Sequence, residues 1–289
     1  MRKLIVGCGY LGRAVARTWR AEGHAVVAIT RSAERAESLA RDGLQPIVAD
    51  VTRPDTLAGL PPAQTVLYSV GFDKRGAASR REVYVEGLAT ALDALSNDTE
   101  RILFTSSTGV YGRADGAWVD EQTPCHPTRE GGRLMGAAEQ VLREHRLSDR
   151  AVVLRLAGLY GPGRIPRLAD LLAGRPIAVP SIGYVNLIHV DDAAAAVVAA
   201  DRRGRPGRTY LVSDGNPVPR REFYTDLATA LGLPAPSFVE PPPEAVSEGR
   251  AAASKRVANA RMRRELGVDL RYPSYREGLR AIAAGGVTI

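Results

Sequence analysis

The start of the chain contains the motif that most constrains its fold. An apolar run, Lys3 to Val6, leads directly into Gly7-Cys8-Gly9-Tyr10-Leu11-Gly12, and apolar residues at helical spacing follow. A Gly-x-Gly-x-x-Gly loop between a strand and a helix is typical of a Rossmann-type dinucleotide site. The first glycine permits a tight turn, the second lets the backbone approach a pyrophosphate, and the third lets the helix pack on the strand. The helix N-terminus attracts the phosphates, so we expect cofactor contacts from Gly7, Gly9, Tyr10, Leu11 and Gly12.

Short apolar runs alternate with helical stretches along the first half of the chain. This alternation indicates right-handed βαβ units and a parallel sheet covered on both faces. The predicted fold is therefore α/β, a Rossmann-type doubly wound parallel sheet. The predicted strands after the first are His24 to Thr30, Pro46 to Ala49, Thr65 to Val70, Arg101 to Thr105, Ala151 to Leu156 and Arg208 to Val212, with helices near 33–42, 79–95 and 134–147.

After residue 158 the regular alternation weakens, and glycines and prolines interrupt shorter elements. We expect residues 1–158 to form the nucleotide-binding core, completed by about 186–213. Residues 159–185 and 214–289 are expected to form a smaller C-terminal substrate-binding lobe. Such a lobe would lie over the carboxyl ends of the strands, where open α/β sheets bind ligands.

Composition excludes several other classes of protein. The net charge is +7, but the arginines are spread along the chain and interleaved with acids, which argues against a nucleic-acid partner. Two cysteines and four histidines form neither a disulfide framework nor a metal-ligand spacing. No apolar run reaches the length of about 18 residues that a membrane helix needs, and no signal peptide is expected. These features favour a cytoplasmic protein with no metal and no membrane partner.

The end of the predicted second strand favours NADP over NAD. An NAD site usually places an acid there, about 20 residues after the glycines, to hold the ribose 2′-hydroxyl. This chain has Thr30-Arg31-Ser32 instead, with no acid before Glu34. Arg31 can bind a 2′-phosphate through two hydrogen bonds, and the hydroxyls of Thr30 and Ser32 can donate to it. Arg31 as an ordinary solvated arginine is the alternative.

The third and fourth strands should also end at the cofactor. By position in such a fold, Asp50-Val51 is expected near the adenine amino group, and Ser69-Val70-Gly71 beside the adenosine ribose. Cys8 is expected to fill apolar space in the glycine loop, although a helix N-terminus can also depress a thiol pKa.

The order of motifs resembles the extended short-chain dehydrogenase/reductase superfamily, the NAD(P)-dependent epimerase/dehydratase group. The resemblance implies a Rossmann core, a C-terminal substrate lobe, a homodimer formed through two helices, and small-molecule substrates that are frequently nucleotide-linked sugars. It covers nearly the whole chain and is carried by four ordered segments: Gly7 to Gly12, Phe104 to Gly112, Leu154 to Arg164 and Asn186 to Asp192.

The resemblance also identifies a catalytic serine but not its usual partners. The family serine matches Ser107, whose hydroxyl would bind a substrate oxygen. The family then uses Tyr-x-x-x-Lys, in which the tyrosine is the acid/base. Arg129 and Arg133 occupy these places, and none of the three lysines lies four residues after a tyrosine. Arg129 cannot act as an acid near neutral pH, because an arginine pKa exceeds about 12. Arg133 can still bind a cofactor ribose.

Other residues must therefore be considered as the proton donor. Tyr111 is the nearest tyrosine to Ser107 in sequence, although the family position is usually structural, and Tyr160 and Glu130 are alternatives. His189 lies in an apolar run and is interpreted as a packed histidine rather than a proton shuttle. Asp191 and Asp192 are expected to cap the alanine-rich helix that follows.

The predicted lobe offers polar and cationic groups to a substrate. We expect Tyr160, Arg164, Asn186 and the segment 254–259 to face the cleft, which favours an anionic substrate. Two functional hypotheses follow. The first is an NADP(H)-dependent oxidoreductase or epimerase with altered catalytic residues, and the second is an inactive NADP(H) sensor on the same fold.

Overall fold

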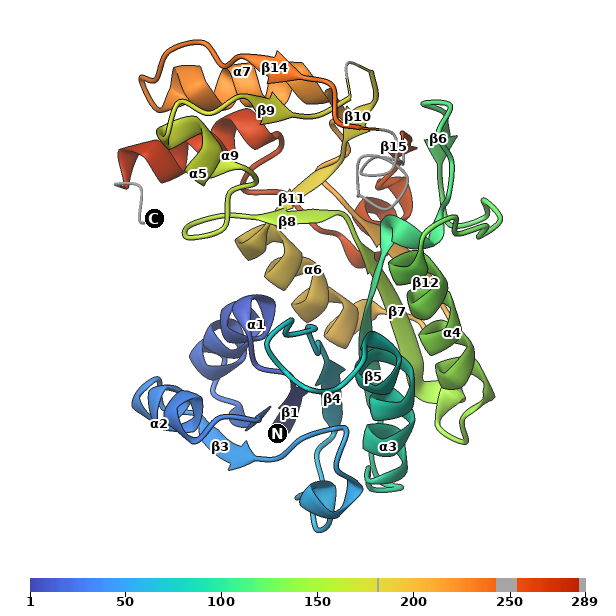
Figure 1. Ribbon diagram of the computed structural model, residues 1–289. Helices are drawn as coiled ribbons and strands as arrows, with labels where there is room; N and C mark the ends of the chain where they lie inside the picture. Colours follow the sequence, from blue (N-terminus) through green and yellow to red (C-terminus); the bar gives the residue numbers. More distant parts are fainter. Residues whose placement is uncertain (181, 243–253, 286–289) are drawn as a thin grey trace.

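The computed structural model describes residues 1–180, 182–242 and 254–285, and its centre is a parallel sheet of seven strands (Figure 1). The strand order is β12-β7-β5-β4-β1-β2-β3, and every pair in this sheet is parallel. This confirms the predicted doubly wound sheet. The strands are β1 (Arg2–Val6), β2 (Ala25–Thr30), β3 (Gln45–Val48), β4 (Thr65–Tyr68), β5 (Arg101–Ser107), β7 (Ala151–Leu156) and β12 (Thr209–Val212).

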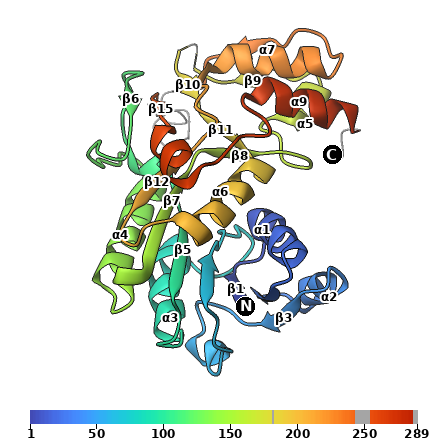
Figure 2. The same ribbon diagram turned by 180° about the vertical axis from the view of Figure 1, so that it is seen from behind.

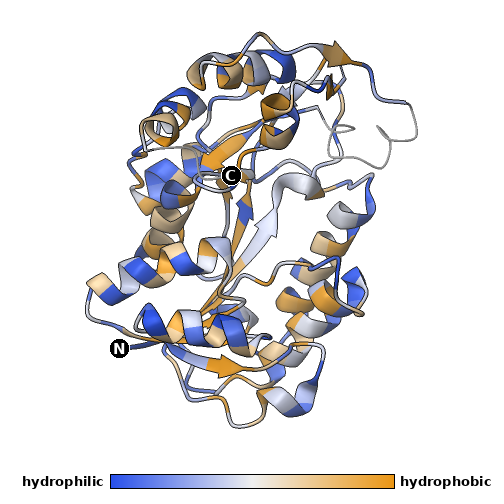
Figure 3. Cartoon of the chain, turned by 60° about the vertical axis from the view of Figure 1, so that its left-hand side comes forward, coloured by the Kyte–Doolittle hydropathy of each residue, from blue (hydrophilic) through white to orange (hydrophobic). Residues whose placement is uncertain are grey.

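Helices cover both faces of the sheet because its strands are apolar on both sides. Successive residues point to opposite faces: Leu4 and Val6 belong to one apolar cluster, and Ile5 belongs to the other. One face packs against α1 (Tyr10–Ala21), α2 (Ala33–Arg41) and α6 (Val190–Arg203); the other packs against α3 (Gly87–Asp93) and α4 (Glu130–Glu144) (Figures 1 and 2). Figure 3 shows hydrophobic residues in the central strands and hydrophilic residues along the outer sides of the helices. Short helical segments complete this part: η1 (Pro54–Leu57), η2 (Glu82–Glu86), η3 (Thr108–Val110) and η4 (Ser148–Arg150).

Short elements form a second layer beyond the carboxyl ends of the strands (Figure 1). Their own apolar cluster includes Phe223, Leu227, Tyr275 and Leu279, all nearly fully buried. Residues 181, 243–253 and 286–289 of the predicted lobe lie outside the described residues. The elements are β8 (Gly158–Tyr160), α5 (Leu168–Leu172), β9 (Ile177–Ala178), β10 (Tyr184–Val185), β11 (Leu187–His189), β13 (Val218–Pro219), α7 (Arg220–Ala230), β14 (Phe238–Val239) and α9 (Tyr275–Ala284).

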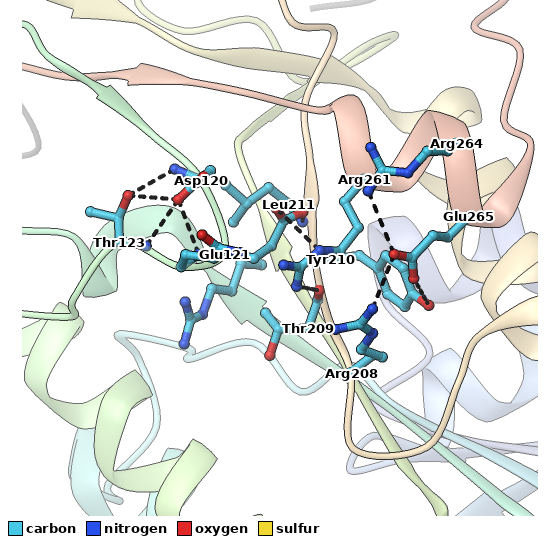
Figure 4. Close-up of polar contacts among 12 residues, drawn as sticks. Asp120, Glu121, Thr123, Arg208, Thr209, Tyr210, Leu211, Arg261, Arg264 and Glu265 are labelled. Atoms are coloured by element: carbon cyan, nitrogen blue, oxygen red, sulfur yellow. Dashed lines mark hydrogen bonds and ion pairs between the residues drawn. The ribbon is translucent and has the colours of Figure 1, made fainter.

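Part of the C-terminal segment returns to the core. Strand β15 (Arg256–Val257) pairs in parallel with β6 (Trp118–Val119), and η6 (Met262–Leu266) buries its first and last residues in the core cluster beside α6. Figure 4 shows how polar contacts attach this segment to the sheet edge. Glu121 accepts a hydrogen bond from the Leu211 amide (3.0 Å) and pairs with Arg261 (3.6 Å), whose guanidinium also donates to the Thr209 carbonyl.

The start of α6 differs from the expectation. His189, buried as predicted, accepts a hydrogen bond from the Asp191 amide and is itself the N-cap. Asp192 accepts from the amides of Arg271 and Tyr272. The prediction that the two aspartates cap the helix was therefore wrong: they lie in its first turn, and Asp192 holds the chain that leads to α9.

Candidate functional site

The glycine loop has the shape that a dinucleotide pyrophosphate requires. Gly7 has φ +87°, and a Cβ there would lie 2.7 Å from the Ser69 carbonyl oxygen. A Cβ on Gly12 would lie 3.0 Å from the Gly7 carbonyl oxygen. At Gly9 a Cβ would meet nothing within 4 Å, and no side chain caps the helix that begins there. Two glycines are therefore required by packing, whereas Gly9 leaves open space at an uncapped helix N-terminus, as phosphate binding needs.

Cys8 is buried in this loop and is not activated. Burial is the largest influence on its thiol and raises its pKa to about 12. The pKa is raised rather than depressed, because desolvation of the thiolate is the largest influence on it. The expectation of a small apolar residue is met instead.

Arg164 lies beside the glycine loop. Its guanidinium is 5.4 Å from the centre of the Tyr10 ring, and the Tyr10 hydroxyl donates to the Pro162 carbonyl (3.1 Å). The loop after β8 is thereby attached to the first residue of α1. Leu11 next to it is buried in the core. The structure thus places Arg164 against Tyr10 of the glycine loop, and its expected contact with a substrate stays a prediction.

Arg31 lies half-exposed at the carboxyl end of β2. Its guanidinium is 3.5 Å from Asp73, in the loop that follows β4. Ser32 caps α2 by accepting a hydrogen bond from the Arg35 amide, and Thr30 is buried. The three residues therefore differ in how readily they could bind a ligand. Thr30 is buried, Ser32 already caps α2, and only Arg31 presents its charge to solvent at the sheet edge.

The ends of β3 and β4 adjoin the same edge. The Asp50 carboxylate accepts from the amide and hydroxyl of Thr52, which fixes its orientation. Val51 is buried, and a Cβ on Gly87 would lie 2.6 Å from it. The Ser69-Val70 backbone lies against Gly7, and a Cβ on Gly71 would meet nothing within 4 Å. Strand order thus gathers the predicted cofactor residues along one edge.

Ser107 ends β5 and lies close to Arg129. Its Oγ accepts a hydrogen bond from the Gly109 amide (3.0 Å). A Cβ on Gly109 would lie 3.2 Å from this Oγ and 3.7 Å from Arg129 Nη2. Arg129 is the N-cap residue of α4, so its guanidinium reaches the serine turn. Arg133 is exposed and donates to the Thr128 carbonyl (2.7 Å), at the outer side of the same helix start.

Tyr111 belongs to a buried polar network that sequence reasoning missed. Its hydroxyl accepts from Arg155 (2.6 Å), and Arg155 pairs with Glu139 through two hydrogen bonds (2.9 and 2.6 Å). Ser106 donates to the same carboxylate (2.6 Å). Burial raises the Tyr111 pKa to about 12, and the side chain is 1% exposed. The structure therefore places Tyr111 below the site surface, while its proposed catalytic role stays a prediction. The sequence did contain a signal for this network: Glu139 and Arg155 occupy positions where the pattern of the surrounding helix and strand predicts apolar, buried residues.

The other predicted substrate residues face inward. Both ends of the Asn186 amide bind backbone, donating to the Lys255 carbonyl (2.9 Å) and accepting from the Val257 amide (2.7 Å). Tyr160 is fully buried, its hydroxyl has no hydrogen-bond partner among the described residues, and burial raises its pKa. Asn186 thus positions the C-terminal segment, and Tyr160 belongs to the core of the second layer.

Asp214 lies near Tyr160 and predicts a pH-dependent stability. Burial raises its pKa to about 7, with Asp192 and Glu277 contributing, and one carboxyl oxygen has no hydrogen-bond partner in the described part of the chain. Because folding favours the protonated form, stability should fall as pH rises from about 4 to about 7 and then level off, by at most about 4 kcal/mol. Urea denaturation at pH 5 and pH 8 should show a smaller difference for Asp214→Asn than for wild type. Equal differences would contradict this assignment; the opposite contribution of His189, whose pKa burial lowers, is present in both proteins.

Residues 1–180, 182–242 and 254–285 contain neither a metal-binding cluster nor a membrane-spanning helix. No group of three or more His, Cys, Asp or Glu side chains is arranged to hold a metal ion. No helix in these ranges is both long and apolar enough to cross a membrane.

The strand order, the glycine loop and the serine at the end of β5 together define a Rossmann-type dinucleotide-binding protein of the extended short-chain dehydrogenase/reductase class. The chain belongs to the NAD dependent epimerase/dehydratase family, which residues 4–213 match. This confirms the resemblance found in the sequence.

Relatives and structures agree with this assignment. Protein YeeZ of Escherichia coli strain K12 is 31% identical over 281 residues, covering 94% of this chain and 97% of YeeZ. The 3-diazoavenalumate denitrifying reductase of a Streptomyces species is 30% identical, covering 96% and 99%. The structure of the dTDP-glucose 4,6-dehydratase DesIV from Streptomyces venezuelae, with NAD and TYD bound, has a TM-score of 0.83 over 98% of this chain and 96% of DesIV. At 21% identity, this last likeness shows the fold alone.

Proposed function

We propose that this protein is an NADP(H)-dependent oxidoreductase that acts on a small anionic carbonyl or hydroxyl compound, for which a sugar nucleotide is one candidate. The observation that carries the proposal is that Gly9, Arg31 and Ser107 all lie at the carboxyl edge of the sheet, at the ends of β1, β2 and β5. The related Streptomyces protein is named a reductase. This name supports redox chemistry without fixing the substrate.

Separate residues could bind the cofactor and polarise the substrate. A nicotinamide dinucleotide, when bound, supplies or accepts a hydride. Gly9 and the N-terminus of α1 would hold its pyrophosphate, and Arg31 its 2′-phosphate, for which Asp73 is a competing partner. The Ser107 hydroxyl would donate to the substrate oxygen, and the Arg129 guanidinium beside it would stabilise negative charge developing there. The proposal also includes a homodimer, which the family resemblance implies, and a cytoplasmic location, which the composition favours.

A second candidate function is an inactive NADP(H) sensor. Arg129 and Arg133 in place of the tyrosine and lysine favour it, because neither arginine can exchange a proton near neutral pH. Incubation with NADPH and a panel of carbonyl compounds and sugar nucleotides separates the two functions. Turnover that Ser107→Ala abolishes supports the enzyme, whereas tight NADPH binding without turnover across the panel supports the sensor.

Cofactor preference is tested at Arg31. Arg31→Asp should weaken NADPH binding at least about tenfold, because it replaces a phosphate-binding cation by an anion. It should not weaken NADH binding, because an acid at this position can hold the ribose 2′-hydroxyl. Fluorescence titration with both cofactors measures this. Arg41→Asp, an exposed position at the end of α2, is the matched control and should have no effect. Wild-type protein that binds NADH as tightly as NADPH would overturn the NADP assignment.

A further inference from the structure

Three cationic side chains from distant parts of the chain gather between the core and the second layer. They are Arg129 at the start of α4, Arg220 at the start of α7, and Lys255 immediately before β15. Arg220 and Lys255 are each only 6% exposed. Burial lowers the Lys255 pKa to about 8, and Arg129 and Arg220 both lower it further. Burial and Arg129 likewise lower the pKa of Arg220. The backbone geometry also brings Arg220 and Lys255 together: a Cβ on Gly183 would lie 2.7 Å from Arg220 Nη1, and a Cβ on Gly116 would lie 3.3 Å from the ring of the next residue, Tyr184. The Gly116 amide in turn donates to the carbonyl of Ser254, which precedes Lys255.

Lys255 has a neutral partner only. Its ammonium donates to the Tyr111 carbonyl (3.1 Å), and among the described residues no carboxylate pairs with it. Arg220 donates to the Ile182 carbonyl (3.2 Å), and both arginines take part in further interactions. A buried ammonium beside like charges is costly unless an anion compensates it. Such a cost is typical of a site that a ligand completes.

Backbone hydrogen bonds to neighbouring segments fix the position of Lys255. Asn186 binds the backbone at Lys255 and just after it, donating to the Lys255 carbonyl and accepting from the Val257 amide. The Ser213 hydroxyl donates to the Val257 carbonyl (3.2 Å), and β15 pairs with β6. A segment held by this many backbone contacts presents the ammonium in one place, which a binding site requires.

This cluster borders the Ser107 turn. Arg129 lies over Gly109, next to the Ser107 hydroxyl, and Lys255 binds the carbonyl of Tyr111 at the end of the same turn. The three cations are therefore separate from the glycine loop and Arg31, which lie at the ends of β1 and β2.

We propose that Arg129, Arg220 and Lys255 form a binding site for one oxyanion group of the substrate, a phosphoryl or a carboxylate, beside Ser107. The proposal rests on the proposed function and names its substrate class. Two guanidiniums and an ammonium can share the oxygens of a single phosphoryl group, whereas a carboxylate engages two of the three cations. The bound anion supplies the negative charge that Lys255 lacks, and it places the adjoining carbon skeleton against the serine hydroxyl.

The test is to add inorganic phosphate or acetate, at constant ionic strength set with sodium chloride, to wild-type protein and to Lys255→Met. Binding and the accompanying rise in Tm are measured with and without saturating NADPH. Wild type should bind one of the two anions. Lys255→Met should bind it at least about tenfold more weakly, and Lys255→Arg should retain it. The anion that binds identifies the group as phosphoryl or carboxylate.

Matched controls separate this site from the cofactor site. Lys74→Met removes an exposed lysine and should leave anion binding unchanged. Without anion, Lys255→Met should be at least as stable as wild type, because it removes a buried charge, and its Tm should not respond to phosphate or acetate. An equal response in Lys255→Met and Lys74→Met, or no response of wild type to either anion, would overturn the proposal. Failure of NADPH to bind, with the Lys255-dependent response intact, would instead refute the NADP proposal alone.

Discussion

Replacing Glu139 by glutamine is expected to lower the free energy of unfolding by about 3 to 5 kcal/mol, the usual cost of breaking a buried ion pair. Glu139 is 2% exposed and Arg155 is 8% exposed. The change leaves the Arg155 charge buried without its counter-ion, and it weakens the contact that Ser106 makes one residue before Ser107. Activity should therefore fall together with stability.

Urea denaturation of wild type, Glu139→Gln, the single variants Glu139→Met and Arg155→Met, their double variant and Arg143→Ala checks this prediction. The Glu139→Met/Arg155→Met double variant should be more stable than the sum of the single variants implies, because neither charge then remains unpaired. Arg143→Ala is the matched control: Arg143 contacts the same carboxylate at 3.5 Å but is 54% exposed, so its loss should cost at most about 1 kcal/mol. Additive single effects would show that the pair is not coupled.

Two glycines of the phosphate loop should respond oppositely to the same substitution. Gly9→Ala adds a methyl group where the protein itself has open space, so stability should change by less than about 0.5 kcal/mol. NADPH affinity should fall at least about tenfold, because the methyl group blocks approach of the pyrophosphate. Gly7→Ala should instead destabilise the protein by about 1 to 3 kcal/mol, since its Cβ overlaps the Ser69 backbone at a positive φ.

Thermal unfolding and NADPH titration of the same samples provide both measurements. Gly136→Ala on α4 is the control, because its Cβ also meets nothing within 4 Å but lies away from the loop. It should keep wild-type affinity. If Gly9→Ala binds NADPH normally, the pyrophosphate does not approach this loop.

The central sheet could be predicted because its information is local. Each strand of the sheet is an apolar run bounded by turn residues, and Gly7 to Gly12 fixed the position of the first βα unit. Parallel strands then bring the residues that follow them to one edge, whatever their separation in sequence. This is why Arg31, Asp50, Ser69 and Ser107 could be assigned to that edge without coordinates.

The positions of Arg129, Asn186 and Lys255 could not be predicted, because they depend on contacts between distant segments that the periodicity of the sequence does not encode. The place of Arg129 follows from Gly132, where a Cβ would lie 2.3 Å from the Gly109 carbonyl oxygen; this close approach brings the start of α4 to the serine turn. Similarly, Asn186 was expected to face the substrate because it is polar. In the structure, however, both the NH₂ and the carbonyl oxygen of its side-chain amide bind backbone groups. Lys255 lies in the segment 254–259, which was expected to face the cleft, but its burial could not be predicted because burial of a single cation has no sequence signature.

The pairing of β15 with β6 joins two segments that are far apart in the chain, and its backbone hydrogen bonds do not depend on side-chain identity. The nucleotide loop therefore lies at one end of the polypeptide, and a cation beside the serine comes from near the other. With the proposed oxyanion site, substitutions around Lys255 would alter which compounds the protein accepts and would leave the glycine loop and Arg31 untouched. Substrate preference and cofactor preference could then change independently.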